Sequence, residues 1–137
     1  MFVAHLIHES GGFQHREEIG RGRGQPYGTT FYGRGYIQLT WEGNYQAASY
    51  DIFGDSRLVT NPDCVSASPR LSMRVSVWYW EERVRPQAGS FRNFYATTKA
   101  INGGLETSPC HPAAKKRYSF YRKAADVLGV ANLAFEG

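Results

Sequence analysis

The chain has 137 residues, of which 42% are hydrophobic, 20% charged and 15% aromatic, and its 16 basic and 12 acidic side chains give a net charge of +4. This length is enough for one domain with a sizeable core, and no apolar run reaches the roughly 18 residues that a membrane-spanning helix needs. The positive charge favours a polyanionic partner, namely nucleic acid, an acidic membrane or an anionic cell wall, without choosing among them. No basic segment precedes the short apolar run at the N-terminus, so no signal peptide is visible.

Residues 2–10 are expected to form a short helix. Phe2, Leu6 and Glu9 fall on one stripe of this helix, and the glycines at 11–12 end it. A carboxyl group that continues an apolar stripe would keep its proton near neutral pH if it were buried. The alternative is that Glu9 lies at a frayed helix end and reaches water.

No metal site is expected. His5, His8 and Glu9 have the order His-x-x-His-Glu, whereas the zinc-protease helix needs His-Glu-x-x-His. Cys64 and Cys110 are too few for a zinc site, and they form either one disulfide or two free thiols.

Residues 13–26 predict a mobile, charged loop. Its Arg-Gly-Arg-Gly run at 21–24 is similar to the arginine-glycine segments that bind nucleic acid. One short run inside a patterned domain supports such a function only weakly. A phosphate loop is excluded, because no Gly-Lys-Ser or Gly-Lys-Thr follows.

The stretch from Tyr27 to Tyr45 combines glycines, aromatic rings and neutral polar groups. The polar groups are Gln38, Thr40 and Asn44, and the rings include Tyr32, Tyr36, Trp41 and Tyr45. A sugar-binding cleft needs this combination, because rings stack on C–H faces while amides and hydroxyls pair with sugar hydroxyls. An aromatic-rich turn before a half-buried helix start explains the same composition.

Helices are expected over residues 37–50, from Ser68-Pro69 onward, over 91–102 and from Pro112 to Gly129, with loops at 51–61, 86–90 and 105–111. The loop after residue 50 should turn at Gly54-Asp55. Apolar residues on two faces of the helix after Pro69 indicate core packing. No repeat and no domain boundary is visible.

Glu9 and Glu18 form the candidate pair for chemistry. On one continuous helix a spacing of nine residues, about two and a half turns, would put them on opposite faces. The double glycine breaks the helix, so Glu18 is free to fold back toward Glu9. Two carboxyl groups across a polar, aromatic cleft suit glycosidic hydrolysis, one protonating the leaving oxygen and the other activating water. Two solvated surface charges are the alternative.

Four motifs carry a resemblance to a known family. They are His8-Glu9-Ser10-Gly11-Gly12-Phe13, Phe31-Tyr32-Gly33-Arg34-Gly35-Tyr36-Ile37-Gln38-Leu39-Thr40, Asn44-Tyr45 and Ile101-Asn102-Gly103-Gly104. They closely resemble the family 19 glycoside hydrolases, the plant-type chitinases and related phage endolysins, and the match runs from about residue 2 to about residue 130. The resemblance implies a mainly α, lysozyme-like single domain over residues 1–137, with a long cleft and a small loop/β region near residues 20–36. It also implies a missing or trimmed segment before the acid-bearing helix.

The same resemblance implies roles for individual residues. Glu9 matches the general acid, Glu18 the general base, and Thr40 the residue that helps to hold the attacking water. Glu17 is the alternative base, since plant members have a longer insert at this point. Substrate contacts are expected from Gln38, Asn44, Tyr45 and Asn102, together with the ring of Tyr36. A Glu9–Arg117–Glu106 network is expected to orient the acid.

The expected activity is inverting hydrolysis of β-1,4 bonds in an N-acetylglucosamine polymer, without metal or cofactor. Chitin is the first substrate, and bacterial peptidoglycan, as for an endolysin, is the alternative. Short loops and family cysteines without counterparts argue against long-substrate binding and a conserved disulfide pattern. A non-catalytic wall- or chitin-binding protein and a nucleic-acid binder using Arg21, Arg23 and Arg34 are the rivals. We expect an extracellular or wall-delivered monomer with a polysaccharide partner and neither nucleic acid nor membrane.

Overall fold

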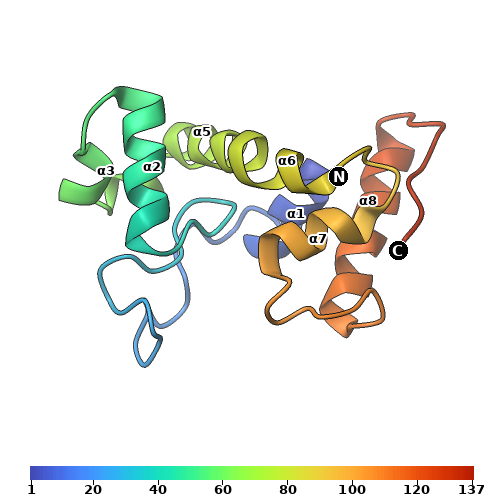
Figure 1. The fold of residues 1–137 in the computed structure, drawn as a ribbon, viewed down its shortest axis with the longest axis horizontal. Helices are drawn as coiled ribbons and strands as arrows, with labels where there is room; N and C mark the ends of the chain where they lie inside the picture. Colours follow the sequence, from blue (N-terminus) through green and yellow to red (C-terminus); the bar gives the residue numbers. More distant parts are fainter. The chain divides into compact units, whose positions relative to one another are not determined.

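The computed structural model describes residues 1–137 and is almost entirely helical, with eight α-helices, one π-helix and only isolated β-bridges. The chain forms two compact units (Figure 1). The first unit contains Met1–His8 and Trp80–Gly137, and the second contains Glu9–Tyr79. No helix has both the length and the apolar character that crossing a membrane requires. The expected single domain over 1–137 stays a prediction.

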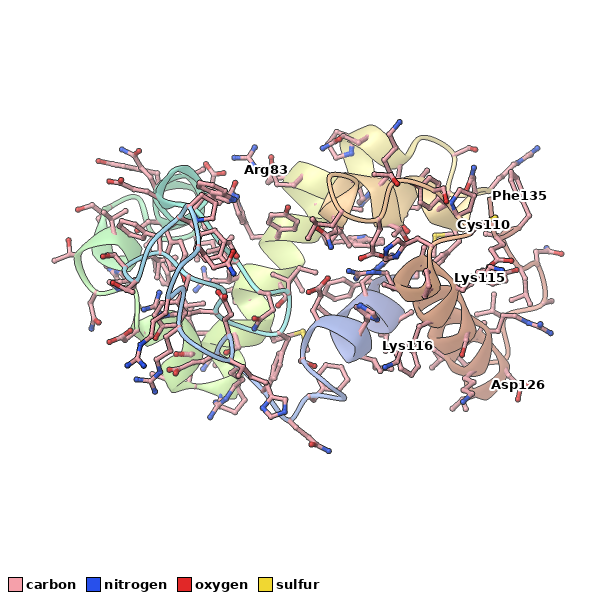
Figure 2. The ribbon with its side chains drawn as sticks, turned by 90° about the horizontal axis from the view of Figure 1, so that it is seen from below. Arg83, Cys110, Lys115, Lys116, Asp126 and Phe135 are labelled. Atoms are coloured by element: carbon pink, nitrogen blue, oxygen red, sulfur yellow. The ribbon has the colours of Figure 1, made fainter.

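The first unit is built from α1 (Phe2–Glu9) without its last residue, the π-helix η1 (Trp80–Val84), α6 (Arg85–Ala88), α7 (Phe94–Asn102) and α8 (Pro112–Val127). Its core joins Phe94 to Tyr121, whose rings stack with centroids 5.0 Å apart, and to small alanines that let the helices approach closely. Figure 2 shows Lys115, Lys116 and Asp126 along α8, where all three are exposed.

Side-chain caps and the C-terminal tail complete this unit. The Asn93 side chain accepts the Ala96 N–H at the start of α7, and His111 Nδ1 accepts the Ala113 N–H before α8. In the tail, the Ala134 N–H donates to the Tyr121 hydroxyl at 2.9 Å. The tail therefore covers the core that α7 and α8 form.

The second unit contains α2 (Glu42–Phe53), α3 (Arg57–Thr60), α4 (Cys64–Ala67) and α5 (Pro69–Tyr79), preceded by a long loop. The Ser68 hydroxyl accepts the Leu71 N–H at 3.1 Å, which confirms the expected cap before Pro69. Ser76 is fully buried in α5, and its hydroxyl oxygen accepts the Ile37 N–H at 3.2 Å. One face of α5 is thereby hydrogen-bonded to the loop.

A buried guanidinium organises that loop. Arg34 is only 2% exposed, and its Nη1 donates to the Thr30 carbonyl at 2.8 Å and to the Tyr45 hydroxyl at 2.9 Å. Its Nη2 donates to Asp63 at 2.7 Å. The carbon of the guanidinium lies 3.6 Å from the centroid of the Tyr32 ring, a cation–π contact. One side chain therefore joins the loop to α2 and to the start of α4.

The Arg-Gly-Arg-Gly run forms consecutive turns. The N–H groups of Arg21, Arg23 and Gln25 each bond to the carbonyl three residues earlier. Gly22 is buried with φ +73°, and a Cβ there would collide with the carbonyl of Gly28. The tight turns of the loop thus explain why glycine occurs in this run.

The expected helix over residues 37–50 is wrong at its start, because α2 begins at Glu42. Gln38 and Trp41 have φ values of +60° and +75°, which no α-helix accommodates. Between them Leu39 exchanges backbone hydrogen bonds with Arg34. Backbone hydrogen bonds between Leu39 and Arg34 therefore take the place of the first turn of the helix that the side-chain pattern predicts.

Four other expectations need correction. The expected helix over 91–102 begins only at Phe94, because Phe91 has a φ of +55° and Asn93 caps the helix. The predicted loop at 86–90 is mostly α6, where Pro86 lies in the first turn and its missing N–H is not needed. The predicted loop at 51–61 contains α3, although the turn at Gly54 is confirmed by its left-handed φ of +73°. Val77 is 43% exposed, so this member of the second apolar stripe of α5 is not a core residue.

Arg34→Ala tests whether the guanidinium holds the second unit together. We expect it to lower the free energy of unfolding by about 2–4 kcal/mol, because a cavity opens and the buried Tyr45 hydroxyl and the partly buried Thr30 carbonyl lose their donor. Urea denaturation measures this. Arg70→Ala, at an exposed arginine of α5, should stay within about 0.5 kcal/mol of the wild type. Equal effects of the two substitutions on the free energy of unfolding would contradict a stabilising role of the Arg34 guanidinium.

Candidate active site

Glu18 is held by the glycine-rich turn of the second unit. Its backbone N–H donates to the Gly33 carbonyl at 2.8 Å. Its carboxylate accepts the Tyr27 hydroxyl at 2.8 Å on Oε1 and the Gly33 N–H at 3.1 Å on Oε2. These donors fix the direction of a half-buried carboxylate. Burial raises the pKa of Tyr27 to about 12, and the hydrogen bond to Glu18 and the charge of Glu18 act in the same direction.

Glu17, the alternative base, is engaged elsewhere. Its carboxylate accepts the Ser66 hydroxyl at 2.8 Å and forms an ion pair with Arg21 at 2.9 Å. Its backbone forms an antiparallel bridge with Arg34, and consecutive side chains of an extended segment point to opposite sides. The geometry therefore favours Glu18 over Glu17 as the carboxylate available for chemistry.

Gln38, Thr40 and Asn44 lie close together, as the sequence pattern indicated. The Gln38 amide donates to the Gly35 carbonyl at 3.1 Å, and the Thr40 hydroxyl donates to the Gln38 carbonyl at 2.8 Å. The Asn44 amide donates to the Thr40 carbonyl at 2.9 Å. All three side chains are half-buried, so their polar groups are ordered without being enclosed.

Gly33 connects this polar turn to Glu18. Its N–H donates to the Glu18 carboxylate, and a Cβ at this position would lie 2.7 Å from Oε1 of Gln38. Any larger residue would displace the amide from its place beside the turn. The glycine is needed for close approach, a role that its place in the motif did not reveal.

The expected substrate contact at Tyr45 is not supported. Tyr45 is fully buried, its hydroxyl donates to the Tyr32 carbonyl at 2.6 Å, and it accepts a bond from Arg34. Burial raises the pKa of Tyr45, against the opposing effect of Arg34. Tyr36 is only 9% exposed, so little of its ring could meet a ligand.

Two other rings have the exposure that a sugar face needs. Trp41 is 50% exposed and meets the edge of Tyr27, with centroids 5.3 Å apart. Phe13 is 39% exposed and meets Tyr36 edge-on at 5.2 Å. Tyr27 was not predicted from the sequence as a site residue. Its hydrogen bond to Glu18 forms only when the loop folds, and the spacing of the two residues in the sequence does not indicate it.

A second polar cluster lies in the first unit. Arg117 and Glu106 are 1% and 2% exposed. The Nε of Arg117 lies 3.0 Å from both Glu106 oxygens, and its Nη2 lies 2.7 Å from Oε1. The Asn102 amide donates to the same carboxylate at 3.1 Å. Burial alone would raise the pKa of Glu106, but the bonds and charge of Arg117 and the Asn102 amide together lower it.

This ion pair is the part of the expected acid-orienting network that the structure describes. The predicted acid, Glu9, is the half-buried last residue of α1, and its link to Arg117 stays a prediction. Its neighbour His8 lies near the pair: burial lowers the pKa of His8 to about 4, the charge of Arg117 adds to this effect, and Glu106 opposes it. His8 is therefore neutral at physiological pH.

Neither unit brings together three His, Cys, Asp or Glu side chains that could hold a metal ion. Cys64 and Cys110 are both free thiols, so of the two alternatives for the cysteines the structure has the unbridged one. Cys110 is exposed in the turn region before α8 (Figure 2). Partial burial raises the pKa of the Cys64 thiol.

Known proteins similar to this chain are chitinases. The sequence model of glycoside hydrolase family 19, described as chitinase class I, matches residues 20–92, more than half of the chain. An endochitinase of Arabidopsis thaliana is 40% identical over 144 residues, covering 96% of this chain and 49% of that protein. Chitinase 6 of Oryza sativa subsp. japonica is 34% identical over 142 residues, covering 94% and 51%.

Solved structures give the same result. Chitinase C from Streptomyces griseus superposes with a TM-score of 0.83 at 28% identity, over 99% of this chain and 61% of that one. A family 19, class IV chitinase from Zea mays gives 0.78 at 28% identity, over 96% and 68%. The mainly helical, lysozyme-like fold expected from the sequence is thereby confirmed.

The chain belongs to glycoside hydrolase family 19, the class I chitinase family. It spans about half the length of the plant relatives that it matches.

The pKa of His8 makes a prediction about stability. The unfolded chain has a histidine pKa near 6.5 and the folded chain one of about 4, so between these values the unfolded state binds more protons. The contribution of His8 to the free energy of unfolding should therefore fall as the pH is lowered from about 6.5 to about 4. An NMR titration of His8 should give a midpoint near 4, and H8Q should flatten the pH dependence. A midpoint between about 6 and 7, the ordinary histidine range, would contradict the burial argument.

Proposed function

We propose that this chain carries the catalytic residues of a glycoside hydrolase that cleaves β-1,4 bonds in polymers of N-acetylglucosamine, with inversion at the anomeric carbon. Membership of family 19 and the similarity to endochitinases support the class of reaction. The environment of Glu18 carries the proposal. Its carboxylate accepts hydrogen bonds from Tyr27 and Gly33, and the backbone of Gly33 also lies against the side chain of Gln38.

The proposed reaction is a single displacement. Glu9 donates its proton to the glycosidic oxygen as the bond from that oxygen to the anomeric carbon breaks. Glu18 takes a proton from a water molecule whose oxygen bonds to the anomeric carbon from the opposite face. Thr40 helps to hold this water. One proton leaves Glu9 and one reaches Glu18, so the two groups must exchange protons with solvent before the next turnover.

Substrate recognition would combine amides with exposed rings. Gln38 and Asn44 offer amide donors and acceptors, and Trp41 offers a half-exposed ring for the C–H face of a sugar. These groups are neutral, which suits an uncharged polymer. Chitin is therefore the first proposed substrate. The proposed enzyme is a monomer that acts outside the cell or at a cell wall.

A cavity in the second unit favours peptidoglycan as the second candidate. It has a volume of about 470 Å³, and its lining includes Arg21, Arg23, Arg34 and the carboxylate of Asp63, which forms an ion pair with Arg34. Because Arg21 and Arg34 are already paired with Glu17 and Asp63, the guanidinium of Arg23 is the cation offered to a carboxylate such as that of a peptide-bearing wall polymer. Clearing of bacterial wall suspensions without cleavage of chito-oligosaccharides would select this candidate over chitin.

Three glutamates allow a matched test of the two acid–base roles. Glu9→Gln and Glu18→Gln should each lower kcat at least about 100-fold on chito-oligosaccharides with little change in substrate binding, because each removes one proton-transfer group. Glu17→Gln is the control, since its carboxylate contacts Ser66 and Arg21, and it should retain most of the activity. A full loss with Glu17→Gln and none with Glu18→Gln would move the base to Glu17.

The same variants decide between the proposal and its rivals. Wall or chitin binding with a biological effect that Glu9→Gln leaves unchanged would indicate a non-catalytic binding protein. Tight, salt-sensitive binding of oligonucleotides without hydrolysis would indicate a nucleic-acid binder.

Tyr27→Phe tests whether the hydrogen bond to Glu18 matters for catalysis. The variant keeps the ring that contacts Trp41 and removes only the hydroxyl. We expect kcat to fall by roughly 3- to 30-fold at nearly constant KM, the loss of one charge-assisted hydrogen bond. Tyr50→Phe, at an exposed tyrosine of α2, is the control and should leave both constants unchanged. An unchanged kcat for Tyr27→Phe would show that Gly33 alone orients the carboxylate.

A further inference from the structure

His5 is enclosed by aromatic rings inside the first unit. It is fully buried in α1, its ring stacks on Phe94 with centroids 4.9 Å apart and an angle of 7°, and Trp80 lies 5.9 Å away. Trp80 opens the π-helix η1, and π-helical turns occur frequently at functional sites. The rings keep water away from the imidazole, so its polar atoms depend on protein partners.

Both nitrogens of His5 have such partners. Nε2 lies 2.7 Å from the Thr97 hydroxyl oxygen, and Nδ1 lies 3.4 Å from Nη1 of Arg117. The Thr97 hydroxyl donates its own proton to the Phe94 carbonyl at 2.6 Å. Its oxygen must therefore accept from His5, which places the imidazole proton on Nε2 and leaves the Nδ1 lone pair facing the guanidinium.

The surrounding charges favour a neutral ring. Burial lowers the pKa of His5 well below its usual range, and the charge of Arg117 acts in the same direction. A protonated ring would turn Nδ1 into a donor aimed at a cation. The hydrogen-bond partners and the nearby positive charge thus agree on a neutral imidazole with its proton on Nε2.

We propose that His5 is a positioning residue for Arg117. The neutral imidazole, oriented by Thr97, accepts from one arm of the guanidinium, while Glu106 accepts from Nε and from the other arm. A guanidinium is planar, so contacts on two edges fix its rotation as well as its location. This role rests on the proposed function, because His5 reaches the reaction only through Arg117 and its proposed orientation of Glu9.

A purely packing role for His5 is the competing explanation, and α7 offers a matched pair of threonines that separates the two. Thr97 and Thr98 are both fully buried, but the Thr98 hydroxyl has no hydrogen-bond partner. Replacement by valine keeps the volume and removes only the hydroxyl in each case. Thr97→Val removes the group that selects the tautomer of His5, whereas Thr98→Val removes a hydroxyl that contributes nothing to it.

The tautomer is tested first, by ¹⁵N NMR of the imidazole in the full chain, a measurement that does not depend on hydrolysis. We expect a neutral ring with its proton on Nε2 in the wild type and in Thr98→Val, and a changed tautomer population in Thr97→Val. A proton on Nδ1, or an imidazolium at neutral pH, would overturn the proposal whatever the enzyme hydrolyses.

Kinetics on chito-oligosaccharides then test the consequence. His5→Leu should lower kcat by about 10- to 100-fold, as is usual when the support of a functional residue is lost, with KM nearly unchanged. His5→Gln should restore most of kcat, because its amide has both an acceptor for Arg117 and a donor for Thr97. Thr97→Val should lower kcat and Thr98→Val should not, with thermal unfolding of each variant showing that it is folded.

Equal kcat values for the two threonine variants, or a His5→Gln variant no better than His5→Leu, would leave packing as the only role of His5 and overturn the proposal. A wild-type chain that binds but does not hydrolyse the oligosaccharides would instead refute the proposed function. In that case the NMR result still decides the tautomer on its own.

Discussion

Each of the two units is built around one buried arginine. In the second unit the guanidinium of Arg34 contacts the Tyr32 ring and donates to Thr30, Tyr45 and Asp63. A buried guanidinium without partners would be very costly, so these groups must all be in place together. The residue before it is Gly33, whose N–H reaches Glu18, and so the packing of Arg34 and the direction of the proposed catalytic carboxylate are set by the same segment.

In the first unit Arg117 is the buried arginine that corresponds to Arg34. Glu106 compensates its charge, the Asn102 amide donates to Glu106, and Nδ1 of His5 lies beside one arm of the guanidinium. Removing either member of such a pair leaves the other as an uncompensated buried charge, which is more damaging than loss of the pair as a whole. A buried ion pair contributes little net stability. We therefore assign Arg117 and Glu106 a role in orienting the proposed acid and not a role in stabilising the core.

The sequence predicts the fold best where local chemistry decides. Ser68-Pro69 starts a helix and Gly54 ends one through caps that depend only on nearby residues. It fails where backbone pairing in a turn decides, as at Gln38 and Trp41, whose left-handed backbone accompanies the pairing of Arg34 with Leu39 and leaves no trace in the hydrophobic pattern. For the site, resemblance to a family located the Glu106–Arg117 pair but not side-chain direction. Tyr45 points into the interior, and the contacts of Tyr27 and His5 arise only on folding.

The configuration of the first product tests the central claim most directly. If Glu18 activates a water molecule on the face opposite the leaving group, hydrolysis of a β-linked chito-oligosaccharide must first release the α-anomer. Proton NMR that follows the anomeric signals during the first turnovers, before mutarotation, distinguishes the two anomers. The account predicts the α-anomer first. Initial release of the β-anomer would contradict it, because retention requires a covalent or substrate-assisted intermediate in place of direct attack by water.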